Sequence, residues 1–202
     1  AATADDLVEL AEHCALAGVP ELGRALATLD AARRATPTAT WQAEHSRLFE
    51  GGCLCPVNET AYVRRDKGAI LADLAGFYGA FGFAPAENVG EKPDHLVSEL
   101  QFTALLLVML ARAEDAGDDE AAAVTNDALA AFADDHPGVW LELFCERLAA
   151  TTALPVVAAL AETLSGAWRA LAAEHGFATA APAVASGVCD DPGATPYECD
   201  GC

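Results

Sequence analysis

Carboxylate, imidazole and aromatic side chains gather at positions where a plain helical bundle does not need them, and they are the residues that could bind a partner. They are Glu59, Tyr62, Glu91, Pro93, Asp94, His95, Glu99, His136 and Trp140, and Tyr78, from the apolar stripe of the helix expected over residues 66–81, is a further candidate. Carboxylates such as Glu91 and Asp94 offer hydrogen-bond acceptors to guanidinium groups, while Tyr78 and its apolar neighbours offer a surface to an apolar peptide. The chemistry that these acceptors favour is recognition of a cationic group.

Several of these residues could instead have a purely structural role, and the sequence does not decide between that role and partner binding. Asp94 falls where a helix is expected to begin, so its carboxylate could serve as an N-terminal cap. His95 could hydrogen-bond the preceding loop. Trp140 lies four residues from both His136 and Phe144, which places the three rings on one helical face if the helix reaches back to His136, and the Trp140 ring could pack in the core.

The sequence contains none of the common catalytic signatures. It lacks the zinc-binding His-Glu-x-x-His, the phosphate loop Gly-x-x-x-x-Gly-Lys-Ser/Thr, the Gly-x-Ser-x-Gly of hydrolases and the dinucleotide motif Gly-x-Gly-x-x-Gly. Gly76, Gly79 and Gly82 belong to a predicted helix and its end rather than to a turn after a strand. We therefore predict that the chain is not an enzyme and has no cofactor.

The seven cysteines leave a second kind of site open. Cys53-x-Cys55 and Cys199-x-x-Cys202, with Cys189 nearby, could form a thiolate metal site or a reversible disulfide, and ordinary thiols are the third interpretation. An odd number of cysteines in a chain that does not need disulfides for its core argues against an extracellular disulfide framework.

Apolar positions recur at spacings of three and four residues, which predicts roughly seven or eight helices and no strands. The expected helices cover residues 5–17, a short stretch after Pro20, 40–50, 66–81, 93–116, 121–132, 139–150 and 154–175. Cys14 and Cys145 fall on apolar helical stripes and are expected in the core. The helix starting near Pro93 is apolar almost all round and is expected at the centre.

The fold class predicted is all-α, a single-domain helical bundle. We expect this domain over residues 1–177, followed by a flexible, Cys-bearing tail over residues 178–202, because the tail contains several prolines and glycines and no periodicity.

The charge balance restricts the partners. Eleven Lys and Arg against 31 Asp and Glu give a net charge of −20, which repels nucleic acid and anionic lipid and attracts cationic segments, although such charge also serves solubility alone. The longest apolar run, residues 104–111, is shorter than the about 20 residues that a membrane span needs, and the first residues lack the basic start of a secretory signal. We expect a cytoplasmic protein without stable membrane association.

Taken in order, the motifs resemble those of redox-enzyme maturation chaperones of the TorD/DmsD/NarJ type. A Pro-x-x-Glu-Ser/Thr-x-Tyr loop, a Glu-x-Pro-Asp-His-x-x-x-Glu-Leu-x-Phe motif and a His-x-x-x-Trp-x-x-x-Phe motif are similar to those of that family. The matching residues are Pro56, Glu59, Thr60, Tyr62; Glu91, Pro93, Asp94, His95, Glu99, Leu100, Phe102; and His136, Trp140, Phe144. The double glycine and Cys-x-Cys at residues 51–55 depart from the general pattern.

The resemblance implies an all-helical chaperone whose partner is the catalytic subunit of a molybdenum-cofactor redox enzyme. It would bind the twin-arginine signal peptide, or another segment, of the apoenzyme, assist cofactor insertion and delay export. Two alternatives stay open: a small helical Cys-based metal-binding or redox protein, and a structural subunit retained in a redox complex.

Overall fold

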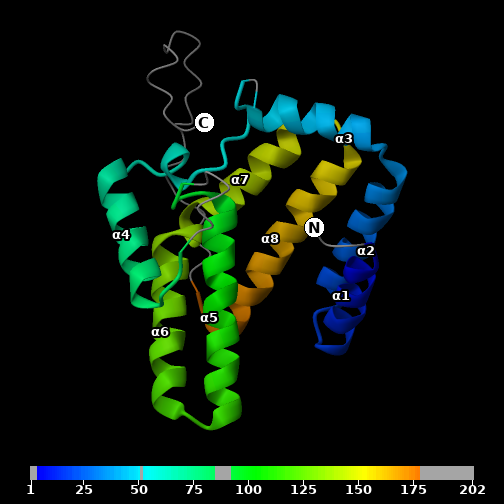
Figure 1. The fold of residues 1–202 in the computed structure, drawn as a ribbon. Helices are drawn as coiled ribbons and strands as arrows, with labels where there is room; N and C mark the ends of the chain where they lie inside the picture. Colours follow the sequence, from blue (N-terminus) through cyan, green and yellow to red (C-terminus); the bar gives the residue numbers. More distant parts are fainter. Residues whose placement is uncertain (1–3, 51, 85–91, 178–202) are drawn as a thin grey trace. The chain divides into compact units, whose positions relative to one another are not determined.

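The protein is all-α, as the sequence predicts. The computed structural model describes residues 4–50, 52–84 and 92–177, and within these ranges it forms eight α-helices and no strand (Figure 1). The helices are α1 (Ala4–Leu16), α2 (Pro20–Ala35), α3 (Thr38–His45), α4 (Lys67–Ala80), α5 (Leu96–Ala116), α6 (Asp119–Asp135), α7 (Pro137–Thr151) and α8 (Pro155–His175). A π-helical turn, η1 (Ser46–Glu50), continues α3, and a 3-10 turn, η2 (Glu59–Ala61), precedes α4.

The chain divides into two compact units, each assembled from segments that are distant in sequence. Unit 1 combines the residues up to Pro56 with Glu142–Glu174, and unit 2 combines Val57–Leu141 with the residues from His175 onward. The division of the chain into a single domain over 1–177 and a tail over 178–202 stays a prediction, and the tail lies outside the described residues.

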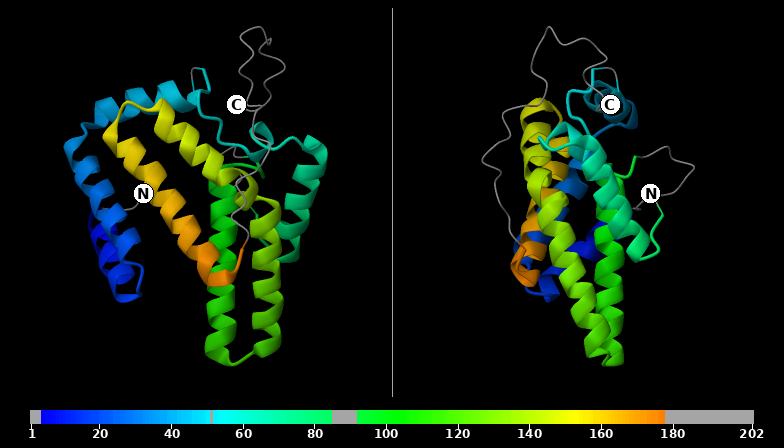
Figure 2. Two further views of the ribbon diagram at one scale, coloured as in Figure 1. Left: turned by 180° about the vertical axis from the view of Figure 1, so that it is seen from behind. Right: turned by 90° about the vertical axis from the view of Figure 1, so that its left-hand side faces the viewer.

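In unit 1, α1 and α2 form an antiparallel hairpin that requires glycine at two positions (Figures 1 and 2). Gly18 turns the chain between the helices with φ +81°, a conformation that side chains with a Cβ disfavour. A Cβ at Gly23 would lie 2.9 Å from the carbonyl oxygen of Ala11, so α2 approaches α1 closely at that point. Cys14 is buried, as predicted, and α2 runs for 16 residues rather than the short stretch expected after Pro20.

A buried carboxylate also holds unit 1 together. Glu44 accepts hydrogen bonds from Arg47 Nε and Nη2, both at 2.7 Å, and from Thr152 Oγ1 at 2.7 Å. It thereby joins α3 to the connection between α7 and α8. The Arg47 hydrogen bonds are the main cause that lowers the pKa of Glu44 to about 2, so this carboxylate stays ionised at neutral pH.

In unit 2, α5 and α6 form a second antiparallel hairpin (Figures 1 and 2). Gly117 ends α5 with φ +66°, and the Asp118 carboxylate accepts a hydrogen bond from Ala121 N at 3.1 Å to cap α6. The core of this unit is aromatic. Phe102 lies 4.7 Å from Phe132 and 4.9 Å from Tyr78 between ring centroids, which joins α4, α5 and α6.

Helix α5 is not packed on nearly every side, which corrects the prediction made from its apolar sequence. Phe102, Leu106 and Leu110 are buried, whereas Val97 and Val108 are 38% and 48% exposed. A helix with this many apolar residues leaves some of them at the surface when only one of its faces meets a neighbour.

By length and composition alone, α5 and α8 could each cross a membrane, although no apolar run in the sequence suggested it. This is weak evidence for a membrane protein, because core helices of soluble proteins pass the same test and both helices have a buried face. The absence of stable membrane association stays a prediction.

Candidate functional site

Two motif segments that are distant in sequence are joined by backbone hydrogen bonds in unit 2. Glu59 N donates to Asp94 O at 2.9 Å, and Leu96 N donates to Val57 O at 2.8 Å, which makes an isolated antiparallel bridge between Asn58 and His95. The loop before α4 and the residues before α5 are therefore neighbours in space. The motifs found in the sequence form parts of one site.

Asp94 fastens these two segments together from a fully buried position. Its Oδ1 accepts from Asn58 Nδ2 at 3.1 Å, and its Oδ2 accepts from Thr60 Oγ1 at 2.7 Å and from Thr60 N at 3.3 Å. The carboxylate is thus occupied by the preceding loop and is not available for a direct contact with a guanidinium group.

The structure corrects the predicted start of this helix. His95, not Asp94, is the N-terminal cap of α5, since its Nδ1 accepts from Val97 N at 3.1 Å, and the helix begins at Leu96 rather than near Pro93. The backbone of Asp94 and His95 pairs with the segment before α4, and this pairing prevents the helix from starting earlier.

Tyr78 anchors the same loop from α4. Its hydroxyl donates to Pro93 O at 2.7 Å, while its ring packs against Phe83 at 4.9 Å. Burial raises the pKa of Tyr78, and the nearby carboxylates Glu99, Glu59 and Asp94 raise it further, so the hydroxyl keeps its proton and remains a donor. Only 4% of Tyr78 is exposed, which makes it a support for the loop rather than a surface for a peptide.

Behind the loop lies a polar network of four fully buried side chains, Glu59, Glu99, His136 and Trp140. Trp140 Nε1 donates to Glu99 Oε2 at 2.9 Å, and His136 Nδ1 lies 2.9 Å from Glu59 Oε2. A carboxylate oxygen accepts hydrogen bonds, so the tautomer of His136 that carries its proton on Nδ1 satisfies this pair. Tyr62 stacks on Trp140 with ring centroids 5.3 Å apart and closes one side.

Glu99 is the member of this network whose carboxyl pKa is raised. Burial raises its pKa well above the usual value, the Glu59 carboxylate raises it further, and the hydrogen bond from Trp140 opposes these effects. The Oε1 atoms of Glu59 and Glu99 are buried and have no hydrogen-bond partner among the described residues. The raised pKa lets Glu99 hold a proton to higher pH than an exposed glutamate does, and a proton there avoids two negative charges in a dry interior.

The structure thus brings together nine of the ten predicted partner-binding residues, while Glu91 lies outside the described residues. Pro93 and His95 are half-buried, and the remaining seven are buried. Sequence reasoning did not identify Asn58, which is 4% exposed and supplies a donor to Asp94, as part of the site. The sequence signal that could have identified Asn58 is its place directly before Glu59 in the motif.

The predicted cysteine site has a different outcome for each residue. Cys53 is disulfide-bonded, whereas Cys55 is a buried free thiol whose pKa burial raises. Cys189, Cys199 and Cys202 lie outside the described residues. Within the described ranges no cluster of three His, Cys, Asp or Glu side chains could hold a metal ion. Cys145 is a buried free thiol, as predicted.

Comparison with known proteins identifies the family. Residues 16–146 match the family model described as nitrate reductase delta subunit, which is more than half of the 202 residues. The chain belongs to the nitrate reductase delta subunit family. The matched residues include all three motifs, and the resemblance to redox-enzyme maturation chaperones is confirmed.

Two relatives of this family member are named as assembly chaperones. It is 38% identical to the selenate reductase assembly chaperone protein of Thauera selenatis and 35% identical to the chlorate reductase assembly chaperone protein of Ideonella dechloratans, over 116 residues each. Each match covers 55% of this chain and 59% of the relative, so the chain spans less than two-thirds of the relatives' length. No solved structure matches it. Neither relative is named as a catalytic enzyme, which agrees with the prediction that this chain is not one.

Proposed function

We propose that this chain is a chaperone for the catalytic subunit of a molybdenum-cofactor redox enzyme. It binds the apoenzyme at its twin-arginine signal peptide or at another segment, assists cofactor insertion and delays export, and it does so in the cytoplasm. The observation that carries the proposal is the family match together with the two relatives named as assembly chaperones of reductases.

The buried network supports a binding role over a catalytic one. Its titratable groups Glu59, Glu99 and His136 are all fully buried, so a substrate has no access to them in this structure. A catalytic acid or base must come within hydrogen-bonding reach of its substrate. These residues instead fix the conformation of the loop that precedes α5.

We assign client contact to the surface at the start of α5, made by Pro93, His95, Val97 and Gln101. Val97 and Gln101 are exposed and lie one helical turn apart, while Pro93 and His95 are half-buried. In this proposal the buried motif residues hold this surface in place: Glu59, Tyr62, Tyr78, Asp94, Glu99, His136 and Trp140. Glu91 is a further proposed contact.

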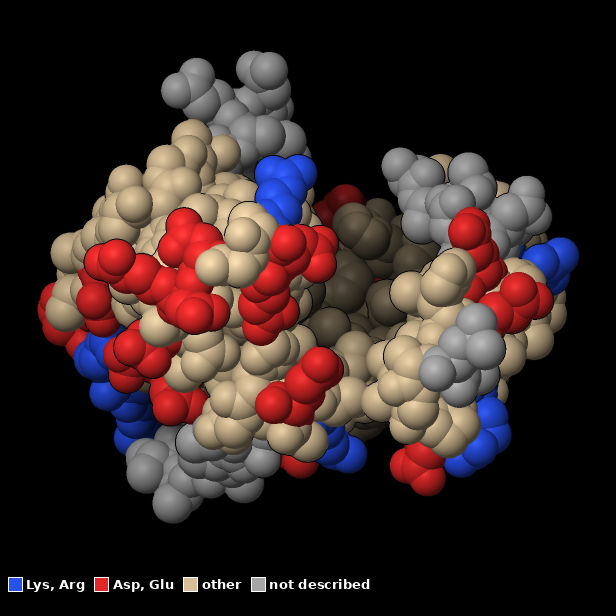
Figure 3. Space-filling view, turned by 90° about the horizontal axis from the view of Figure 1, so that it is seen from below, with Lys and Arg blue, Asp and Glu red and all other residues tan. Residues whose placement is uncertain are grey.

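The charge of the chain favours a cationic client segment. The net charge is −20, and Figure 3 shows acidic side chains prevailing over basic ones on the face that it presents. Acidic residues concentrate where α5 joins α6, a stretch that includes Glu114, Asp115, Asp118, Asp119 and Glu120. Such a field attracts basic segments and speeds their encounter with the chain.

Affinity capture from the native host tests this proposal. The tagged full chain should retain the catalytic subunit of a molybdenum enzyme, identified by mass spectrometry. Val97→Lys should reduce the amount retained, because it places a positive charge against a cationic segment, and Val124→Lys, which changes a valine that is 59% exposed on α6, serves as the matched control. Capture of no redox-enzyme subunit by the parent chain contradicts the chaperone function, and equal capture by both variants contradicts the contact surface.

The alternative of a retained structural subunit is favoured by the family description, delta subunit. The stoichiometry of the mature enzyme separates the two functions. A chaperone is absent from the cofactor-loaded enzyme, whereas a structural subunit copurifies with it in a fixed ratio.

A further inference from the structure

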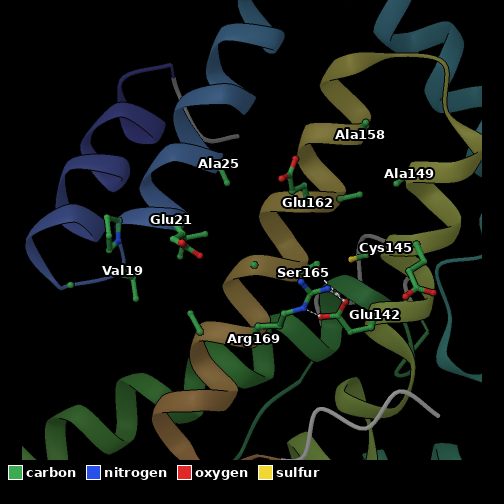
Figure 4. A pocket seen from close by; sticks show the side chains of 17 residues that line it. Val19, Glu21, Ala25, Glu142, Cys145, Ala149, Ala158, Glu162, Ser165 and Arg169 are labelled. Carbon is green, nitrogen blue, oxygen red and sulfur yellow. Dashed lines mark hydrogen bonds and ion pairs between the residues drawn. The ribbon is translucent and has the colours of Figure 1, made fainter. Parts of the chain in front are cut away.

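Unit 1 contains an open groove of about 840 Å³ that none of the sequence motifs identified (Figure 4). Three stretches line it: residues 18–25, at the turn between α1 and α2; residues 142–149 of α7; and residues 158–170 of α8. A helix about 10 Å wide with a pitch of 5.4 Å occupies roughly 400 Å³ per turn. The groove therefore has room for about two turns of a helix.

The walls of the groove suit an apolar occupant. Ala149 of α7 and Ala158 of α8 contribute small side chains, which allow a helix backbone to approach closely, and Val19 and Leu22 form part of the opposite wall. Cys145 adds a neutral thiol, because burial raises its pKa to about 12. Apolar walls with a few polar groups are typical of binding sites for apolar ligands.

The polar groups in the groove leave an excess of negative charge. Arg169 is neutralised by Glu142, which accepts from its Nε at 3.1 Å and its Nη2 at 2.9 Å, and Ser165 Oγ donates to the same carboxylate at 2.8 Å. Two exposed glutamates in the lining, Glu146 and Glu162, have no hydrogen bond or ion pair among the described residues. They are available to an incoming cation.

A third glutamate, Glu21, adds to this charge from the other wall. Its side chain is 91% exposed, and its single ion pair, with Arg24, is long at 3.5 Å and open to solvent. Such a pair contributes little stability, so Glu21 can exchange it for a cation of a ligand.

We infer that this groove binds an apolar helical segment of the client, about two turns long, whose flanking basic side chains pair with Glu21, Glu146 and Glu162. The inference rests on the proposed chaperone function and gives it a specific site. The occupant is a segment of another protein, because none of the chain's segments outside the described ranges, 1–3, 51, 85–91 and 178–202, contains a Lys or Arg. A second copy of the chain is disfavoured by its net charge of −20.

The test uses a labelled synthetic peptide with two arginines followed by about three turns of leucine and alanine, and fluorescence anisotropy with the full chain. The parent should bind this peptide, and should bind it more weakly at high salt or when citrulline replaces both arginines. Glu146→Lys/Glu162→Lys should raise Kd by roughly tenfold or more, because two charged contacts become repulsive. Ala149→Trp should block the groove and abolish binding.

Matched controls distinguish binding in the groove from attraction of the peptide by the overall negative charge of the chain. Glu114→Lys/Asp127→Lys makes the same change in net charge at exposed residues of α5 and α6, and Ala123→Trp adds the same side chain to the exposed surface of α6. These controls should bind as the parent does. The inference is overturned if the groove variants also bind as the parent does, or if the controls lose as much affinity.

Client capture distinguishes the failure of this inference from the failure of the proposed function. If the groove variants still retain the catalytic subunit as well as the parent does, the groove assignment is wrong and the chaperone function stands. If the parent chain retains no catalytic subunit, the proposed function itself is wrong.

Discussion

Replacement of Asp94 by alanine tests whether this carboxylate joins two segments through buried hydrogen bonds or serves only as a helix cap. The sequence alone suggests a cap, and loss of a cap costs about 1 kcal/mol. The structure instead places the carboxylate in a fully buried position where it accepts hydrogen bonds from Asn58 Nδ2, Thr60 N and Thr60 Oγ1. The two interpretations differ in the stability that Asp94→Ala should lose.

The magnitude follows from the donors that the substitution leaves without a partner. A hydrogen bond to a charged group contributes about 1.5–3 kcal/mol, and an unsatisfied buried donor costs about 1–3 kcal/mol. Asn58 is 4% exposed, so its Nδ2 is poorly placed to find water, whereas Thr60 is half-buried and recovers part of its loss. We expect Asp94→Ala to lower the free energy of unfolding by about 3 kcal/mol.

Urea denaturation followed by far-ultraviolet circular dichroism measures this loss. Asp66→Ala is the matched control, because Asp66 is an exposed cap of α4 that accepts from Ala69 N at 2.8 Å, and its loss should cost about 1 kcal/mol. Thr60→Val should remove one donor to Asp94, and the double variant should lose less than the sum of the two single variants. Equal losses in Asp94→Ala and Asp66→Ala, or strict additivity with Thr60→Val, would refute the fastening role.

Three further predictions concern titration, thiol reactivity and the tail. Burial and Glu59 raise the pKa of Glu99, so the stability that its proton confers is present below about pH 4.3 and is lost as pH rises through the folded-state pKa. Glu99→Gln should remove this pH dependence of the free energy of unfolding, measured by urea titration at several pH values. An unchanged pH profile in this variant would contradict the prediction. Iodoacetamide should alkylate Cys55 and Cys145 slowly in the folded chain and rapidly in urea, since burial raises the pKa of both thiols. Mass spectrometry that shows equal alkylation rates in the two conditions would contradict this prediction. Truncation after about Ala178 should leave Tm nearly unchanged when full and truncated chains are compared with the Cys53 disulfide reduced, because the tail sequence has no apolar stripe to bury; a large fall in Tm by calorimetry would show that the tail is docked.

The helices were predictable because their signals are local. Gly117 ends α5 and Gly176 follows the end of α8, as the sequence indicated, and the periodic apolar positions gave the all-α fold. The start of α5 was not predictable to the residue. The first residue of α5 is determined by the pairing of Asp94 and His95 with residues 57–60, more than 30 positions earlier. No local sequence pattern indicates that pairing.

The burial of the motif residues could not be predicted from their types. Glutamates are rarely buried, so Glu59 and Glu99 were expected to meet a partner at the surface, yet both are fully buried and hydrogen-bonded to His136 and Trp140. The core position considered for Trp140 is confirmed, whereas His136 follows the end of α6 and does not share helix α7 with Trp140. The groove in unit 1 was missed altogether, because its walls come from three segments that share no motif.

The molybdenum content of the client's catalytic subunit tests the central claim most directly. The subunit is produced in the native host with and without this chain, purified, and analysed for molybdenum by mass spectrometry. The chaperone function predicts that the subunit made without the chain lacks most of its molybdenum and regains it when the chain is restored. An equal molybdenum content with and without the chain would contradict the claim.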